Sequence, residues 1–264
     1  MRLIIGLLCA ICATMAAAQP QEIAYGAHPL QKMDLYMPAR PTGVIVMLHG
    51  GGWRTGDKGN RSVWQNKAAH WTAQGYAFAS VNTRLIPDAT PVDQAWDLAR
   101  AMALVQQMAA RRGIGTDQIM LVGHSAGAHV AALLAVRQDM QNAAGLQPWQ
   151  GTIMLDSAAF DVPTIMQATP ARLYRQAFGT DPAQWIANSP QAHLDRRDGP
   201  FLIVCSNQRR DACPAAQRFA RQASGHGIAT TLLPVQLGHA EINRRLGQAN
   251  AYTQAVDNWV AALD

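Results

Sequence analysis

The chain has 264 residues, of which 49% are hydrophobic, and a formal net charge of +5. This length and apolar content suit one α/β domain with a large buried core. The modest basic excess does not indicate nucleic-acid binding, because the arginines are scattered pairs rather than a run interleaved with aromatic residues.

The first eighteen residues have the layout of a secretory signal peptide. Arg2 gives a positive start, residues 3–15 are an apolar run, and Ala16 to Ala18 offer a small-residue cleavage site. A membrane anchor is the alternative, but the run is shorter than the roughly 20 residues that span a bilayer. We therefore predict cleavage after Ala18, export to the periplasm or beyond, and a single unanchored domain over residues 19–264.

The elements after the leader alternate between strands and helices. Short runs at 22–27 and 33–37 predict a leading hairpin, and the continuous apolar run at 44–48 is typical of a strand covered on both faces. This alternation predicts a mainly parallel sheet with helices on both faces. The further predicted strands are 76–81, 119–122, 153–155, 201–204 and 230–233.

Four helices are predicted from their apolar periodicity. Residues 90–111 carry apolar side chains at spacings of three and four, and residues 125–136 are apolar almost all round, which indicates a buried central helix. Residues 214–224 and 248–263 are amphipathic. The stretch 160–197 has no strand pattern and is expected to form a small helical cover over the carboxyl edge of the sheet.

A glycine-rich loop follows the predicted strand 44–48. Residues 49–53 read His-Gly-Gly-Gly-Trp, and consecutive glycines allow the backbone to curl so that its amides converge. A flexible turn is the alternative, although such turns seldom follow a buried strand. We predict that the amides of Gly51 and Gly52, with that of Ala126, form an oxyanion hole.

The strand 119–122 runs directly into Gly-His-Ser-Ala-Gly at residues 123–127, and a predicted helix follows at once. A G-x-S-x-G sequence carries weight only in this strand–turn–helix context. The sharp turn strains the backbone and exposes the serine hydroxyl, while Gly123 and Gly127 avoid a Cβ clash. The sequence therefore predicts that Ser125 is a nucleophile.

The general base should lie on a loop after a late strand. His239 follows the strand 230–233, whereas His226 precedes that strand and belongs to the opposite edge. His49, His124 and His129 flank the motifs, where a structural hydrogen-bonding role is the stronger interpretation. We therefore predict that His239 is the base.

Asp211 is predicted by elimination to be the carboxylate that orients His239. It is the only acidic residue between Gly199 and Ala240, and it lies just beyond the strand 201–204. A surface aspartate is the alternative. Ser125, Asp211 and His239 would form a triad in the order Ser, Asp, His.

Two cysteines, Cys205 and Cys213, lie beyond the predicted leader. An even pair in an exported protein indicates a disulfide, with two free thiols as the alternative. No histidine lies at ligand spacing from either cysteine, so a metal site is not expected. Because the pair brackets Asp211, we expect a disulfide to rigidify the acid loop, so that Cys213→Ala lowers stability and activity together.

These motifs resemble the α/β-hydrolase fold and, within it, the His-Gly-Gly-Gly esterases of the hormone-sensitive-lipase branch, with its bacterial feruloyl-esterase-like and arylformamidase-like members. Residues 49–53 followed by Gly-Asp-Lys at 56–58 resemble their oxyanion segment, and residues 82–87 resemble their Tyr-Arg-Leu-x-Pro stretch. The resemblance covers residues 30–264. One departure is the acid loop, which usually reads Gly-x-x-Asp and here reads Ser-Asn-Gln-Arg-Arg-Asp at 206–211.

The resemblance implies a three-layer α/β/α sandwich with a mainly parallel eight-stranded sheet and a small cap or none. The implied function is serine hydrolysis of short-acyl or aryl carboxylic esters, small-molecule substrates, through an acyl-enzyme and without cofactor or metal. An arylformamidase-type amide hydrolase is one alternative. An inactive hydrolase-fold binding module and an interfacial lipase are others; the intact triad argues against the first, and the lack of a long apolar lid in the sequence against the second.

Overall fold

The structure is a computed structural model, and it describes residues 19–263. The predicted signal peptide at 1–18 lies outside this range and stays a prediction. Among residues 19–263, no helix combines the length and the apolar character that crossing a membrane requires.

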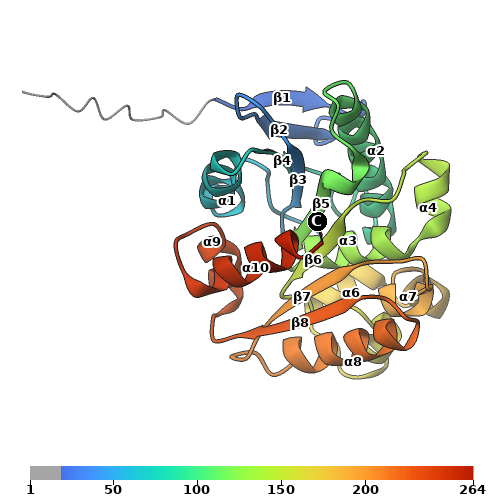
Figure 1. Cartoon of the computed structure of the whole chain (residues 1–264). Helices are drawn as coiled ribbons and strands as arrows, with labels where there is room; N and C mark the ends of the chain where they lie inside the picture. The colour runs from blue at the N-terminus through green and yellow to red at the C-terminus, as the bar shows by residue number, and fades with distance from the viewer. Residues whose placement is uncertain (1–18, 264) are drawn as a thin grey trace, which may run out of the picture.

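One eight-stranded sheet forms the centre of the molecule, in the order β1-β2-β4-β3-β5-β6-β7-β8 (Figure 1). The leading hairpin pairs antiparallel, β2 pairs antiparallel with β4, and all other neighbours are parallel. The mainly parallel eight-stranded sheet is therefore confirmed. The strands are β1 (Gln21–Ala24), β2 (Lys32–Tyr36), β3 (Gly43–Leu48), β4 (Tyr76–Val81), β5 (Ile119–His124), β6 (Gly151–Leu155), β7 (Phe201–Ser206) and β8 (Thr230–Val235).

Helices cover both faces of this sheet. Alternate residues of β3 show why: Val44 and Val46 join the core beneath α2 and α3, whereas Ile45 and Met47 join the core beneath α1, α9 and α10. Figure 1 shows these two groups of helices on opposite sides of the sheet. The helices are α1 (Arg61–Ala73), α2 (Pro91–Ala110), α3 (Ala126–Val136), α4 (Gln138–Ala143), α5 (Val162–Gln167), α6 (Arg172–Phe178), α7 (Pro182–Ala187), α8 (Ala212–Gly225), α9 (His239–Arg245) and α10 (Ala251–Ala261).

The predicted central helix is α3, in which every residue is buried. No helix is predicted from the sequence between the strands at 44–48 and 76–81, yet α1 lies there, because the parallel pair β3 and β4 needs a crossover connection. The expected cover at 160–197 contains three short helices, α5 to α7, and a 3-10 turn at Pro190–His193.

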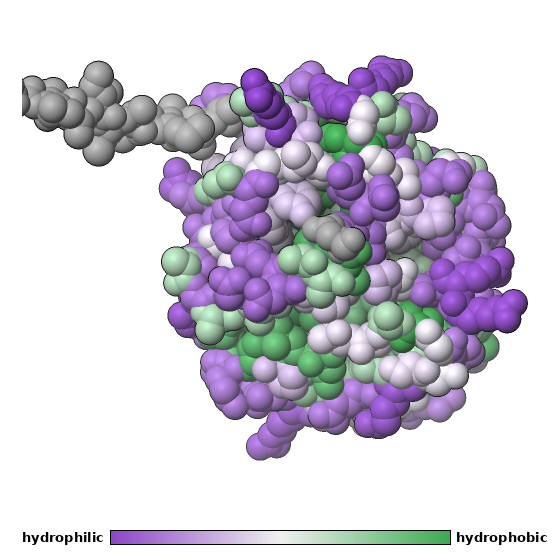
Figure 2. Space-filling model, in the orientation of Figure 1, coloured by the Kyte–Doolittle hydropathy of each residue, from purple (hydrophilic) through white to green (hydrophobic). Residues whose placement is uncertain are grey.

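β8 forms an edge of the sheet, and its residues are only partly buried or exposed. Figure 2 shows apolar surface over this part of an otherwise mostly hydrophilic face.

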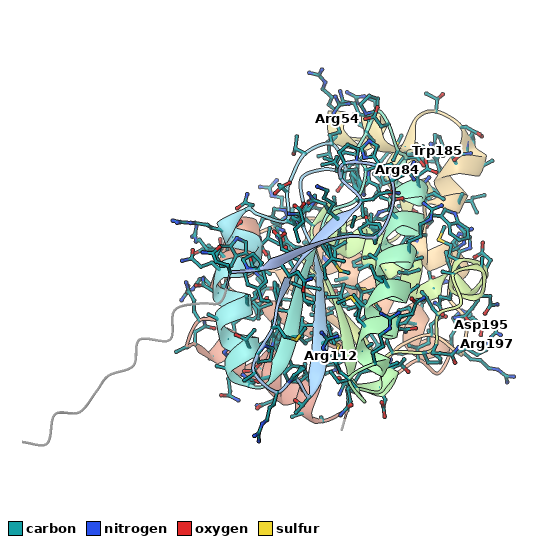
Figure 3. All side chains as sticks on the ribbon, turned by 90° about the horizontal axis from the view of Figure 1, so that it is seen from above. Arg54, Arg84, Arg112, Trp185, Asp195 and Arg197 are labelled. Carbon is teal, nitrogen blue, oxygen red and sulfur yellow. A yellow bond between two sulfur atoms is a disulfide. The ribbon has the colours of Figure 1, made fainter. Side chains whose placement is uncertain are left out.

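The register of the sheet places the carboxyl ends of β5, β6 and β7 side by side. His124 of β5 pairs with Leu155 of β6, and Leu155 pairs with Val204 of β7. The residues that follow these partners therefore leave neighbouring strands at one level of the carboxyl edge. Figure 3 shows Arg54 and Arg84, which follow β3 and β4, near one end of the molecule, whereas Arg112 and the pair Asp195 and Arg197 lie away from that end.

Candidate active site

A strained turn joins β5 to α3. Ser125 has φ 57° and ψ −119°, an unusual conformation for a residue other than glycine, and its amide donates to the Leu155 carbonyl at 2.8 Å. The flanking glycines are needed sterically, since a Cβ on Gly123 would lie 2.2 Å from the Gly127 oxygen and one on Gly127 would lie 2.3 Å from the His49 oxygen. The strand–turn–helix context predicted for Ser125 is therefore present.

Ser125, His239 and Asp156 form a continuous hydrogen-bonded series. His239 is the first residue of α9, and its Nε2 lies 2.9 Å from Ser125 Oγ. Its Nδ1 lies 2.6 Å from Oδ2 of Asp156, the residue that directly follows β6. The structure thus brings the predicted nucleophile and the predicted base within hydrogen-bond distance.

Asp211 does not contact His239, and its predicted orienting role is corrected. Its side chain is 54% exposed, and its Oδ2 accepts from Arg209 Nη2 at 2.9 Å. Asp211 is the only acid of the loop after β7, but β6 ends at the same edge of the sheet and is followed by Asp156. The signal that could have found Asp156 is an acidic residue placed directly after a buried strand.

Asp156 is fully buried and held by several donors. Besides His239, its carboxylate accepts from the Ser206 amide at 2.8 Å and from Arg209 Nη1 at 2.9 Å. Burial alone would raise the pKa of Asp156, but the hydrogen bonds from His239, Ser206 and Arg209 outweigh it and hold that pKa below its ordinary value. The carboxylate is therefore ionised at neutral pH.

Arg209 was not singled out from the sequence. Its guanidinium lies against Asp156, Asp211 and His239 Nδ1. The loop after β7 therefore places a cation beside His239, while the carboxylate comes from the residue after β6.

The glycine loop after β3 reaches the same place. Gly51, Gly52 and Trp53 all have positive φ, at 122°, 60° and 62°. Gly52 and Ala126 line one cavity with Ser125 and His239, whereas Gly51 is not among its lining residues. Ala126 is the first residue of α3, so its amide has no acceptor within its own helix.

The histidines that flank the motifs make structural hydrogen bonds. His129 Nδ1 accepts from Trp53 Nε1 at 3.1 Å, and its Nε2 donates to the Asn188 carbonyl at 2.7 Å. Burial lowers the pKa of His129 to about 4. Burial, with the neighbouring His239, also lowers the pKa of His124 to about 3. Both rings are therefore neutral at neutral pH.

The cavity above Ser125 has a volume of about 290 Å³. Trp53 from the glycine loop, and Leu173 and Tyr174 from α6, give it apolar and aromatic walls. The cover predicted at 160–197 therefore contributes side chains to the candidate site.

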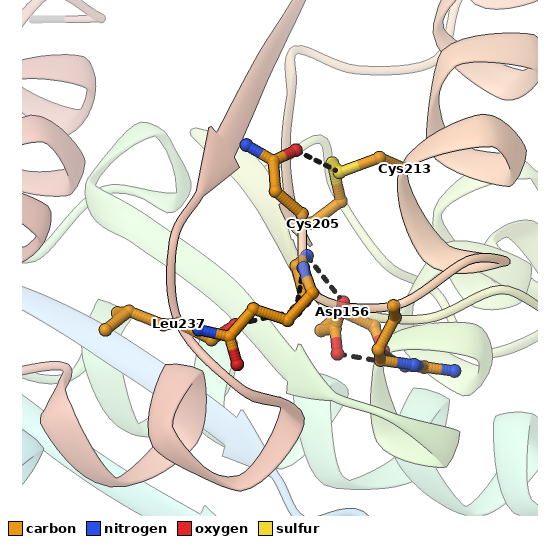
Figure 4. The surroundings of a disulfide bond; sticks show 8 residues. Asp156, Cys205, Cys213 and Leu237 are labelled. Carbon is orange, nitrogen blue, oxygen red and sulfur yellow. Dashed lines mark hydrogen bonds and ion pairs between the residues drawn. A yellow bond between two sulfur atoms is a disulfide. The ribbon is translucent and has the colours of Figure 1, made fainter.

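The two cysteines are bonded, with their Cα atoms 5.0 Å apart, which confirms the predicted disulfide. Cys205 lies in β7 and Cys213 in the first turn of α8, so the bond closes the loop that carries Arg209 and Asp211. Figure 4 shows the disulfide beside Asp156 and Leu237. The loop is thus fixed next to the carboxylate, although it does not supply it.

This sheet, turn and set of side chains define an α/β-hydrolase. The chain belongs to the BD-FAE family, whose model matches residues 33–217. The resemblance to α/β-hydrolase esterases drawn from the sequence is thereby confirmed.

Curated relatives include several esterases. The chain is 33% identical over 121 residues to a probable isoprenylcysteine alpha-carbonyl methylesterase of Oryza sativa subsp. japonica, covering 45% of this chain and 28% of that protein. It is 26% identical over 228 residues to esterase LipQ of Mycobacterium tuberculosis, covering 79% and 53%. The chain thus spans about half of LipQ and under a third of the plant relative.

Solved structures share the fold over nearly the whole chain. The apo form of Thermogutta terrifontis esterase 2 superimposes with a TM-score of 0.75 at 19% identity, covering 94% of this chain and 96% of that one. A putative thioesterase from Silicibacter sp. gives a TM-score of 0.68 at 22% identity, covering 88% and 83%.

Proposed function

We propose that this chain is a serine hydrolase that cleaves carboxylic esters. The observation that carries the proposal is the series Ser125–His239–Asp156, with contacts of 2.9 and 2.6 Å, at the floor of a cavity. The esterase names of its relatives support the same reaction class.

The first half of the reaction forms an acyl-enzyme. His239 Nε2 accepts the Ser125 proton as Oγ attacks the ester carbonyl carbon. Asp156 accepts from Nδ1–H, which fixes the tautomer that leaves Nε2 free as a base, and its ionised carboxylate stabilises the imidazolium. The alcohol then leaves with the proton from Nε2.

Backbone amides stabilise the oxyanion in this scheme. Gly52 and Ala126 are the donors that the cavity supports best, since both line it beside Ser125. Gly51 remains a proposed third donor. Losing one such donor lowers turnover by about 100–1000-fold in other enzymes.

Water then attacks the acyl carbon while His239 Nε2 removes its proton; the bond to Ser125 Oγ breaks, the carboxylic acid leaves, and Oγ regains a proton from Nε2. Apart from the ester and water, every step uses groups of the chain itself, so the proposal needs no metal or cofactor. The volume of about 290 Å³ is at the lower end of small-molecule sites, and with its aromatic walls it supports short-acyl or aryl esters.

Export is proposed on two grounds. The leader pattern at residues 1–18 predicts it, and the Cys205–Cys213 disulfide is of a kind that persists in oxidising compartments. A periplasmic or secreted enzyme is compatible with both.

Ser125→Ala tests the function directly. We expect the variant to fold and to lose hydrolysis of a short-chain aryl acetate, and an organophosphonate to label Ser125 in the wild type only. Ser224→Ala, on the exposed side of α8, is the matched control and should keep full activity. Normal turnover by Ser125→Ala would refute the assignment. Comparing rates on an aryl ester and an N-formyl aryl amine separates the esterase from the formamidase alternative.

A further inference from the structure

We propose that Arg209 and Asp211 are a positioning pair that sets the pH range in which His239 acts as a base. Arg209 opposes protonation of His239, and Asp211 partly offsets Arg209. This inference rests on the proposed function, because it concerns the base of that reaction.

Two donors converge on one carboxylate oxygen. His239 Nδ1 lies 2.6 Å from Asp156 Oδ2, and Arg209 Nη1 lies 2.9 Å from the same atom. The two nitrogens are only 3.0 Å apart. Nδ1 must carry a proton if Nε2 is to accept from Ser125, so Nδ1 has no lone pair for Arg209. The contact of 3.0 Å therefore joins two donors and is not a hydrogen bond.

During catalysis this contact joins two positively charged groups. When His239 takes the Ser125 proton, its imidazolium and the guanidinium share a single carboxylate, and a neighbouring cation disfavours the charged imidazole. Asp211 accepts from Nη2 of the same guanidinium at 2.9 Å and opposes that effect. Because Asp211 is 54% exposed, solvent screens it and its influence is the smaller.

The loop holds Arg209 in place from several sides. The Cys205–Cys213 bond closes the loop, and Ser206 joins it to Asp156 through its amide and to the Leu237 carbonyl through Oγ at 2.6 Å (Figure 4). Arg209 Nη1 also donates to the Asp156 carbonyl at 3.1 Å. The guanidinium is therefore a fixed charge.

The other ionisable groups around His239 do not reproduce this effect. Burial lowers the pKa of His124 to about 3 and raises those of Tyr174 and Tyr252, so all three are neutral near pH 7. Glu241, on the same helix as His239, caps the Gly238 amide. Burial lowers the pKa of Lys67 to about 7, but its ionisation is shared by the wild type and every variant below.

The test is the pH profile of kcat/KM for a short-chain aryl acetate. Its acidic limb reports protonation of the base in the free enzyme. We expect Arg209→Gln to move that limb to higher pH by about one unit, because a cation that opposes the imidazolium is lost. We expect Asp211→Asn to move it to lower pH by about a few tenths of a unit, because a screened anion is lost. The double variant should match Arg209→Gln, because Asp211 acts through Arg209.

Two further variants separate charge from structure. Arg210→Gln removes the same charge from the same loop, but Arg210 is exposed and has no carboxylate partner among residues 19–263, so its profile should match the wild type. Arg209→Lys keeps the charge but cannot contact Asp156 and Asp211 with two separate nitrogens. We therefore expect kcat to fall a few-fold while the acidic limb stays within a few tenths of a pH unit of the wild type.

The inference would be overturned if the acidic limb of kcat/KM moved in neither Arg209→Gln nor Asp211→Asn, or if it moved in the same direction in both. Thermal unfolding and phosphonate titration of active sites verify that each variant is folded. If Arg209→Gln does not fold, the downward shift in Asp211→Asn and the retained limb in Arg209→Lys decide the matter. A wild type without Ser125-dependent hydrolysis would instead refute the proposed function.

Discussion

Ser125 and Asp156 leave adjacent parallel strands at the same level, and both have positive φ, at 57° and 55°. They are nevertheless held in different ways. The turn at Ser125 is enforced by Gly123 and Gly127, which lie within two residues of it in the chain. Asp156 is held by Ser206, Arg209 and His239, which are 50, 53 and 83 residues away.

The difference shows where functional information lies in this chain. The turn around Ser125 is encoded by five consecutive residues, so it can be read without the fold. The carboxylate is selected by contacts among three loops at one edge of the sheet, and its only local signal is an acidic residue directly after a buried strand. The following predictions test this contrast.

Replacing the carboxylate should have the largest effect. We expect Asp156→Asn to lower kcat by about 10³–10⁴-fold, because an amide no longer holds the required tautomer of His239. Asp211→Asn removes the same charge from the same edge of the sheet and should lower kcat by less than about tenfold. Steady-state kinetics of both variants decide the point, and a larger loss in Asp211→Asn would restore the sequence-based assignment.

Disturbing the local turn should act through stability. In Gly123→Ala the new Cβ would lie 2.2 Å from the Gly127 oxygen, and we expect a loss of about 1–3 kcal/mol in the free energy of unfolding. Gly225→Ala is the control, since a Cβ there has nothing within 4 Å, and its stability should change by no more than about 1 kcal/mol. Urea unfolding measures both, and equal effects would contradict the steric account of the turn.

Opening the disulfide should have a moderate effect on stability and, because the loop does not carry the carboxylate, a smaller effect on activity than the sequence-based assignment of Asp211 implied. Replacing both cysteines with alanine removes the constraint on a loop with a sequence separation of 8, and should cost about 2–3 kcal/mol. Because Asp156 follows β6 and does not lie in the loop, kcat/KM should fall by less than about tenfold. Thermal unfolding and kinetics check both expectations. An activity loss as large as that of Asp156→Asn would show that the loop controls the carboxylate.

The sequence alone determined the features that depend on neighbouring residues. Strand–helix alternation predicted the parallel sheet, and β4 at 76–81 has the predicted bounds, because a largely apolar run buried on both faces is a local pattern. The turn around Ser125, the glycine loop at 50–52 and the position of His239 after a late strand were likewise predicted from short segments. The disulfide was predicted from the pair of cysteines that follows the leader together with the predicted export to an oxidising compartment.

Only the tertiary structure decided which acid meets His239 and which side chain of the loop after β7 lies beside it. Asp156 and Asp211 both follow strands that end at the same edge, so strand order could not separate them. The choice depends on the path of the loop after β7, which turns Asp211 toward solvent and brings Arg209 against the buried Asp156. Such a path is set by contacts between segments far apart in the chain, and no local pattern records it.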